Sequence, residues 1–187
     1  MQTLGLDFNN RLILCLCEGN AEIDIMNMLL DNDMLIFDRS MLFEGKVCKR
    51  ESVEMIQEKY LSLSFKDKKL VILRIIDSKH EAFRLSKPYN EMYKSMIFTC
   101  ITSPEIEILI IHKEGGIVDF KKCKSYTKPS GFCKEHYGFK KIKNKGFMNE
   151  YFNDPNGLLE AIVEYEKNSQ RKELSLYDLL KLEYKFD

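Results

Sequence analysis

Acidic side chains stand at the ends of apolar runs in this sequence, where they could act together on a substrate. Glu18 and Asp77 each follow directly after a short apolar run, and Glu105 and Glu107 follow a third. Carboxylate oxygens from separate elements are the ligands that Mg²⁺ prefers, with water and substrate phosphate completing the coordination. These acids are therefore candidate ligands of one divalent cation that activates water at a phosphodiester. The alternative is that they are solvated carboxylates at element ends, where acids are common.

The apolar runs that carry these acids predict strands of a buried sheet. They cover 12–17, 70–76 and 95–101, and each is too short to span a bilayer. Gly19 and Asn20 form a turn after the first run, and apolar residues then recur at helical spacing. An acid where a parallel strand meets its helix lies where open α/β sheets bind ligands. The pattern therefore predicts an α/β fold with a mainly parallel sheet flanked by helices.

The remaining segments predict further helices and turns. The segment 34–37 is a brief strand or turn, and 50–61 has helical spacing. The segment 104–116 is either a helix capped by Thr102 or Ser103 or a strand, because its ILII run is β-prone. The tail predicts helices over 155–168 and 174–184, which form a helical C-terminal extension.

One charged residue inside a predicted strand needs a partner. Arg74 interrupts the second apolar run, and a buried guanidinium must be paired. We expect an acid from a neighbouring strand.

Length and composition indicate one domain. The chain has 187 residues and no net charge, and 31% of its residues are charged. We expect residues 1–112 to form the core, with residues 113–187 packed on the same domain. The N-terminus lacks the pattern of a signal peptide and no run reaches the length of a membrane span, so a cytoplasmic protein without membrane contact is expected.

Positive charge gathers in one segment, which we expect to be loop-rich over 115–131. Residues 113–145 contain ten lysines and three acidic residues. This excess, interleaved with aromatic residues, is typical of a surface that binds single-stranded nucleic acid. The alternative is a solvated loop whose aromatic rings point into the core. The candidate nucleic-acid contacts are Lys121, Lys122, Lys124, Lys128, Lys141 and Lys143.

Three motifs resemble those of the Toprim (topoisomerase-primase) superfamily, and most closely its RloB-like and OLD-type nuclease domains. CEGNAE, from Cys17 to Glu22, resembles the first motif, and LRIIDSK, from Leu73 to Lys79, resembles the second acidic motif. SPEIEILIIH, from Ser103 to His112, is similar to the proline and glutamate motif of the RloB-like proteins. In order and approximate spacing the three motifs span somewhat over half the chain.

The resemblance implies a Toprim-like fold and a role for each matching residue. Glu18 would be the motif-one glutamate, acting as metal ligand or general acid/base, Asp77 a metal ligand, and Glu107 the acid of the third motif. The family's second motif has two aspartates separated by one residue, whereas Lys79 stands at the second position here. A charged lysine cannot bind a metal. Lys79 would instead contact phosphate, and the missing oxygen would then come from another acid: Glu22, Glu81 or Glu105.

The function implied is a Mg²⁺- or Mn²⁺-dependent nuclease that cleaves RNA or DNA, acting as an effector in an antiphage or toxin-like system. The alternative is a catalytically inactive Toprim-like module that binds nucleic acid or a partner protein, which Lys79 favours. A partner that supplies sensing or ATPase function is compatible with the resemblance, and so is a homo-oligomer.

Overall fold

A computed structural model of the chain describes residues 6, 8, 10–65, 68–169 and 172–185. Within these residues the core is a four-stranded, all-parallel sheet in the order β2-β1-β3-β4. The strands are β1 (Arg11–Cys17), β2 (Cys48–Lys49), β3 (Lys69–Ile76) and β4 (Ile97–Ile101). The predicted α/β class is confirmed, and the three predicted strands form nearly where the apolar runs placed them.

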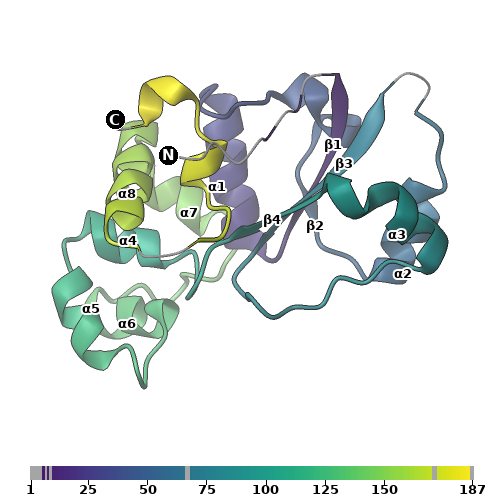
Figure 1. The fold of residues 1–187 in the computed structure, drawn as a ribbon. Coiled ribbons are helices and arrows are strands. Elements are labelled where there is room, and N and C mark those ends of the chain that lie inside the picture. Colours follow the sequence, from purple (N-terminus) through teal and green to yellow (C-terminus); the bar gives the residue numbers. More distant parts are fainter. Residues whose placement is uncertain (1–5, 7, 9, 66–67, 170–171, 186–187) are drawn as a thin grey trace.

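Helices flank the sheet on both faces (Figure 1). The α-helices are α1 (Asn20–Asp31), α2 (Val53–Ile56), α3 (Lys87–Tyr93), α4 (Ile108–Lys113), α5 (Ile117–Cys123), α6 (Pro129–His136), α7 (Phe147–Tyr151) and α8 (Pro155–Lys167). A π-helical turn, η3 (Gln57–Leu61), continues α2. The short 3₁₀ helices are η1 (Arg39–Met41), η2 (Phe43–Gly45), η4 (Lys94–Met96), η5 (Tyr177–Leu179) and η6 (Leu182–Tyr184).

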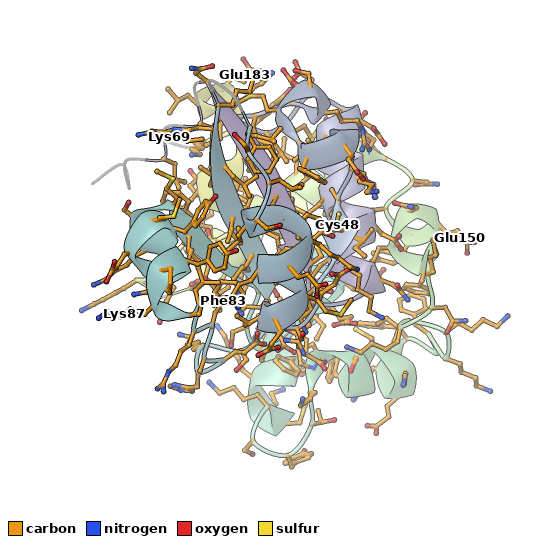
Figure 2. All side chains as sticks on the ribbon, turned by 90° about the vertical axis from the view of Figure 1, so that its right-hand side faces the viewer. Cys48, Lys69, Phe83, Lys87, Glu150 and Glu183 are labelled. Atoms are coloured by element: carbon orange, nitrogen blue, oxygen red, sulfur yellow. The ribbon has the colours of Figure 1, made fainter. Side chains whose placement is uncertain are left out.

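The side chains of β1 and β3 alternate between two apolar cores, because successive residues of a strand point to opposite faces. Cys15 and Leu73 face the larger core, which includes residues of α1, α4 and α8. Leu16 and Ile72 face the smaller core beneath α2 and α3. Figure 2 shows this second side of the molecule, with α2 and α3 nearest the viewer. Burial on both faces explains why the strands are continuously apolar.

Several predicted helices form with shifted ends. The helix predicted over 50–61 begins after Ser52, whose hydroxyl accepts a hydrogen bond from the N–H of Met55. The helix predicted over 155–168 is α8, and Asp154 caps it by accepting from the N–H of Asn156. In the segment 34–37, Leu35 makes an isolated antiparallel bridge to Leu180.

Three expectations about the second half of the chain differ from the structure. The segment 115–131, expected to be loop-rich, contains α5 and the start of α6, and Phe120 of α5 and Phe132 of α6 are buried. The segment 104–116 contains a helix rather than a strand, but α4 begins only at Ile108, so neither Thr102 nor Ser103 caps it. The helix predicted over 174–184 is replaced by η5 and η6.

None of the helices among the described residues is both long and apolar enough to cross a membrane.

Candidate functional site

Glu18 and Asp77 meet at the carboxyl edge of the sheet. The N–H of Glu18 donates to the carbonyl of Ile75 at 2.9 Å, so Glu18 directly continues the β1–β3 pairing. Its Oε2 then accepts a hydrogen bond from the N–H of Asp77 at 2.8 Å. The strand order reverses between β1 and β3, and open α/β sheets bind their ligands at such a switch point. The sequence prediction that these two acids lie together is confirmed.

Glu22 lies in the first turn of α1 and turns back toward Glu18. Its Oε2 accepts a hydrogen bond from the N–H of Gly19 at 3.0 Å, which satisfies a helix N-terminal donor. The side chain is only 7% exposed. Burial, together with the charges of Glu107 and Glu18, raises the pKa of Glu22 to about 7, although hydrogen bonds to backbone N–H groups lower it in part.

Glu105 and Glu107 lie in the turn before α4 and are both buried. Glu105 accepts hydrogen bonds from the N–H of Ser130 at 3.0 Å and from the Lys143 ammonium at 3.1 Å. Burial alone would raise the pKa of Glu105, but these bonds outweigh it and hold that pKa below its ordinary value.

The side chain of Glu107 is 1% exposed and forms an ion pair with Lys143, whose Nζ lies 2.8 Å from Oε1. Neither carboxylate oxygen of Glu107 has a hydrogen-bond partner among the described residues. Burial raises the pKa of Glu107, and Lys143 offsets part of this. The ion pairs in turn raise the pKa of Lys143 although its burial lowers it.

The five acids form one electrostatic group. Burial raises the pKa of Asp77, and Glu18 raises it further through its charge and a hydrogen bond, with a smaller contribution from Glu105. The charge of Glu107 raises the pKa of Glu22, and the charge of Glu105 raises the pKa of Glu107. Like charges held this close favour a bound cation or proton.

The donor set fits a hard divalent cation in chemistry, and Glu107 offers two buried oxygens without hydrogen-bond partners. As the side chains stand in the described part of the chain, no three His, Cys, Asp or Glu groups have the geometry of a metal site. Lys143 instead brings its ammonium to Glu105 and Glu107. Lys128 lies further away, with its Nζ 4.0 Å from Oε1 of Glu105.

Lys79 points away from this group of acids. Its Nζ lies 3.2 Å from both carboxylate oxygens of Glu173, an exposed residue before the C-terminal 3₁₀ turns. The lysine that replaces an acid in the second motif therefore pairs with another surface residue in this structure. Of the three acids considered as substitutes, Glu22 accepts from Gly19, Glu105 from Ser130 and Lys143, and Glu81 pairs with Arg50 and Arg74.

Two arginines beside Glu18 were not among the predicted site residues. The guanidinium of Arg50 pairs with Glu81 and lies 3.7 Å from Oε1 of Glu18. Arg74 pairs with the other oxygen of Glu81 at 2.5 Å and stacks over the Phe83 ring at 4.4 Å. The partner of Arg74 thus comes from the segment after its own strand, not from a neighbouring strand as expected.

The six lysines predicted to contact nucleic acid are all exposed and differ in what they contact. Lys121, Lys124 and Lys128 line a common pocket between α4, α5, α6 and α8. Lys143 is paired with the buried glutamates. The other two, Lys122 and Lys141, are exposed, and Lys122 pairs with Asp119 at 2.7 Å on its own helix.

Most aromatic residues of the basic segment are packed against each other, contrary to a role in stacking bases. Phe120 and Phe132 are buried and meet edge to face, with ring centroids 5.5 Å apart. Tyr137 and Phe139 continue this cluster at 5.8 Å and are partly buried. Tyr126, with 80% of its area exposed, is the exception.

The fold and these residues define an α/β protein with a group of interacting carboxylates at the carboxyl edge of a parallel sheet. The chain matches no protein-family model, and neither a curated protein nor a solved structure is significantly similar to it.

Proposed function

We propose that the chain is a Toprim-like, Mg²⁺- or Mn²⁺-dependent phosphodiesterase that cleaves nucleic acid as an effector in an antiphage or toxin-like system. The observation that carries the proposal is the convergence of Glu18, Asp77, Glu105 and Glu107 with Glu22 at the switch point of the sheet. These residues come from three separate parts of the sequence. They coincide with the acids that the three motifs single out.

The chain's own groups suit hydrolysis of a phosphodiester. A divalent cation held by Glu18, Asp77 and Glu107 would neutralise phosphate charge and lower the pKa of a bound water. Glu22 has a pKa of about 7, so at neutral pH it is able to take a proton from an attacking water. The water oxygen would form the new bond to phosphorus while the bond to the leaving sugar oxygen breaks. Lys128, at the rim of the acids, is placed to contact a neighbouring phosphate.

The test is a cleavage assay with tRNA, single-stranded DNA and duplex DNA, with and without Mg²⁺ or Mn²⁺. Glu18→Gln keeps an oxygen for the N–H of Asp77 but removes the charge, so we expect its metal-dependent cleavage to fall at least about 100-fold. The matched control is Glu164→Gln on α8, because Glu164 pairs with the surface residue Lys167 at 2.9 Å. It should cleave at the wild-type rate.

Absence of any product that requires both the metal and Glu18 would refute the nuclease proposal. Circular dichroism and urea unfolding of Glu18→Gln establish that a loss of activity is not a loss of fold.

A second candidate function is a module that binds nucleic acid without cutting it. Two observations favour it. Lys79 stands in the sequence where the second motif has an acid, and the Lys143 ammonium pairs with both Glu105 and Glu107. Salt-sensitive oligonucleotide binding that survives Glu18→Ala, together with no Mn²⁺ affinity by calorimetry, would decide for this function.

A further inference from the structure

A pocket lies between α4, α5, α6 and α8, beside the acids but separate from them. Its volume is about 250 Å³. Pockets for drug-sized ligands are about 300–1,000 Å³, so this one suits a smaller group. The floor is apolar and includes Ile108 and Phe120, which are both buried. Figure 1 shows α5 and α6 side by side at the lower left, below α4.

The rim of the pocket is positively charged. Lys121, Lys124 and Lys128 all line it, and no acidic side chain is among its described lining residues. Lys121 and Lys124 have no acid within ion-pair distance among the residues that the structure describes, and both are exposed. An apolar floor under a cationic rim is complementary to a flat apolar group that carries a phosphate.

One wall is aromatic and held in place. The rings of Tyr165 and His112 meet edge to face with centroids 5.6 Å apart. The Tyr165 hydroxyl donates a hydrogen bond to the carbonyl of Ser103, which fixes the ring. Burial lowers the pKa of His112, so its ring is neutral at pH 7 and offers both a donor and an acceptor. A fixed aromatic wall is what an unstacked base requires.

The pocket shares a corner with the group of acids. Pro104 lines the pocket, and the next residue is Glu105. Lys128 also lines the pocket while its Nζ lies 4.0 Å from Oε1 of Glu105. The first turn of α6 joins both, since the N–H of Ser130 donates to Glu105 at 3.0 Å. A strand with one base in the pocket would therefore carry its adjoining phosphate toward the acids.

We propose that this pocket binds one unpaired base of a single-stranded nucleic acid, with Lys121, Lys124 and Lys128 contacting the phosphates on either side. The inference rests on the proposed function in one respect, that the acids act on the same strand. If a base must enter the pocket, the substrates of the proposed nuclease are single-stranded segments of nucleic acid. Duplexes would bind only where a base is unpaired.

The test measures binding without cleavage, by fluorescence anisotropy of labelled short oligonucleotides in EDTA. An intact strand is compared with strands that lack one base, scanned through each position. Stacking contributes about 1–3 kcal/mol per base, so loss of the pocketed base should weaken wild-type binding roughly 5- to 150-fold at one position.

Ile117→Trp is the main variant, because Ile117 is half-buried at the start of α5 and lines the pocket. The indole ring of the tryptophan would fill the pocket. We expect intact and abasic strands to bind this variant within about twofold of each other, since neither can use the stacking energy. His112→Ala removes part of the opposite wall and should reduce the discrimination. It serves as the second test where Ile117→Trp lowers stability.

Lysine variants test the rim. Lys124→Ala should weaken binding of intact and abasic strands equally and make the salt dependence shallower by about one charge. The matched control is Lys134→Ala, an exposed lysine of α6 that is not part of the pocket, and it should bind as the wild type does.

Equal wild-type affinity for intact and abasic strands at every position would overturn the inference, and so would discrimination that survives Ile117→Trp. If the protein cleaves nucleic acid but does not discriminate intact from abasic strands, the proposed function is supported and the base-binding pocket is refuted. Base-dependent binding by a protein that never cleaves leaves the pocket and refutes the nuclease.

Discussion

Glu22→Gln should stabilise the protein at neutral and alkaline pH. Glu22 is 7% exposed, and its carboxylate must be buried near other acids when it ionises. Glutamine keeps the oxygen that accepts from the N–H of Gly19 and cannot ionise. The variant therefore removes a charge that the folded state holds at a cost.

The magnitude follows from the pKa. A rise from the ordinary value of 4.5 to about 7 corresponds to about 3 kcal/mol of folding free energy, at 1.36 kcal/mol for each pH unit. Between these two pKa values the folded state binds more protons at Glu22 than the unfolded state, so wild-type stability falls as pH rises. The loss begins near the unfolded pKa and is complete just above the folded one.

The assay is urea unfolding of both proteins across about pH 4 to pH 8, where the difference between them isolates Glu22. We expect the stability advantage of Glu22→Gln to grow by about 3 kcal/mol over this range. Glu164→Gln, which removes an exposed acid of α8, is the control and should show no comparable growth.

A difference between Glu22→Gln and the wild type that stays constant with pH would refute the reasoning. A stability advantage of Glu22→Gln over the wild type that shrinks as pH rises would refute it more directly, because ionised Glu22 would then be favoured by its surroundings.

Three further outcomes are expected. Lys143→Met leaves Glu107 without its ion pair, so it should lower the free energy of unfolding by about 2 kcal/mol near pH 8 and by less at acidic pH, where Glu107 is protonated. Urea unfolding at both pH values measures the two losses, and equal losses would contradict this prediction. Lys79→Asp adds an oxygen where the second motif has an acid and should raise Mn²⁺ affinity in calorimetry above that of Lys79→Ala, and an equal affinity of the two variants would contradict this. Phe132→Ala should cost about 3–5 kcal/mol of unfolding free energy because Phe132 is 2% exposed, and a loss below that of Phe132→Leu would contradict its place in the core.

The sheet and the meeting of Glu18 with Asp77 could be predicted from the sequence, because both depend on local patterns. A continuous apolar run gives a strand buried on both faces, and the carboxyl ends of parallel strands meet at one edge. Position at a strand end was therefore enough to place these two acids.

The cations that surround the acids could not be predicted in the same way. Lys143 reaches Glu105 and Glu107 across more than thirty residues of sequence, and only the packing of α6 onto α4 decides that contact. Arg50 lies beside Glu18 because β2 pairs with β1. The strand β2 is only Cys48–Lys49 and lacks the apolar run that predicted the other strands.

The helices α5 and α6 were missed because the segment 115–131 is rich in glycine and lysine and contains a proline. Pro129 begins α6 at the one position where a missing N–H costs nothing, so a residue that indicates a loop here opens a helix. Phe132 and Phe120 then stabilise the two helices by packing on each other, which no local pattern records.

The hydrogen bond from the N–H of Asp77 to Glu18 makes a side chain act as one more rung between β1 and β3. The hydrogen bond fixes Oε2 against the backbone of β3, and Oε1 lies on the side of Arg50. Position 18 therefore requires the length of a glutamate side chain as well as its charge. An aspartate is one methylene shorter and could not both accept from the neighbouring strand and face the other acids.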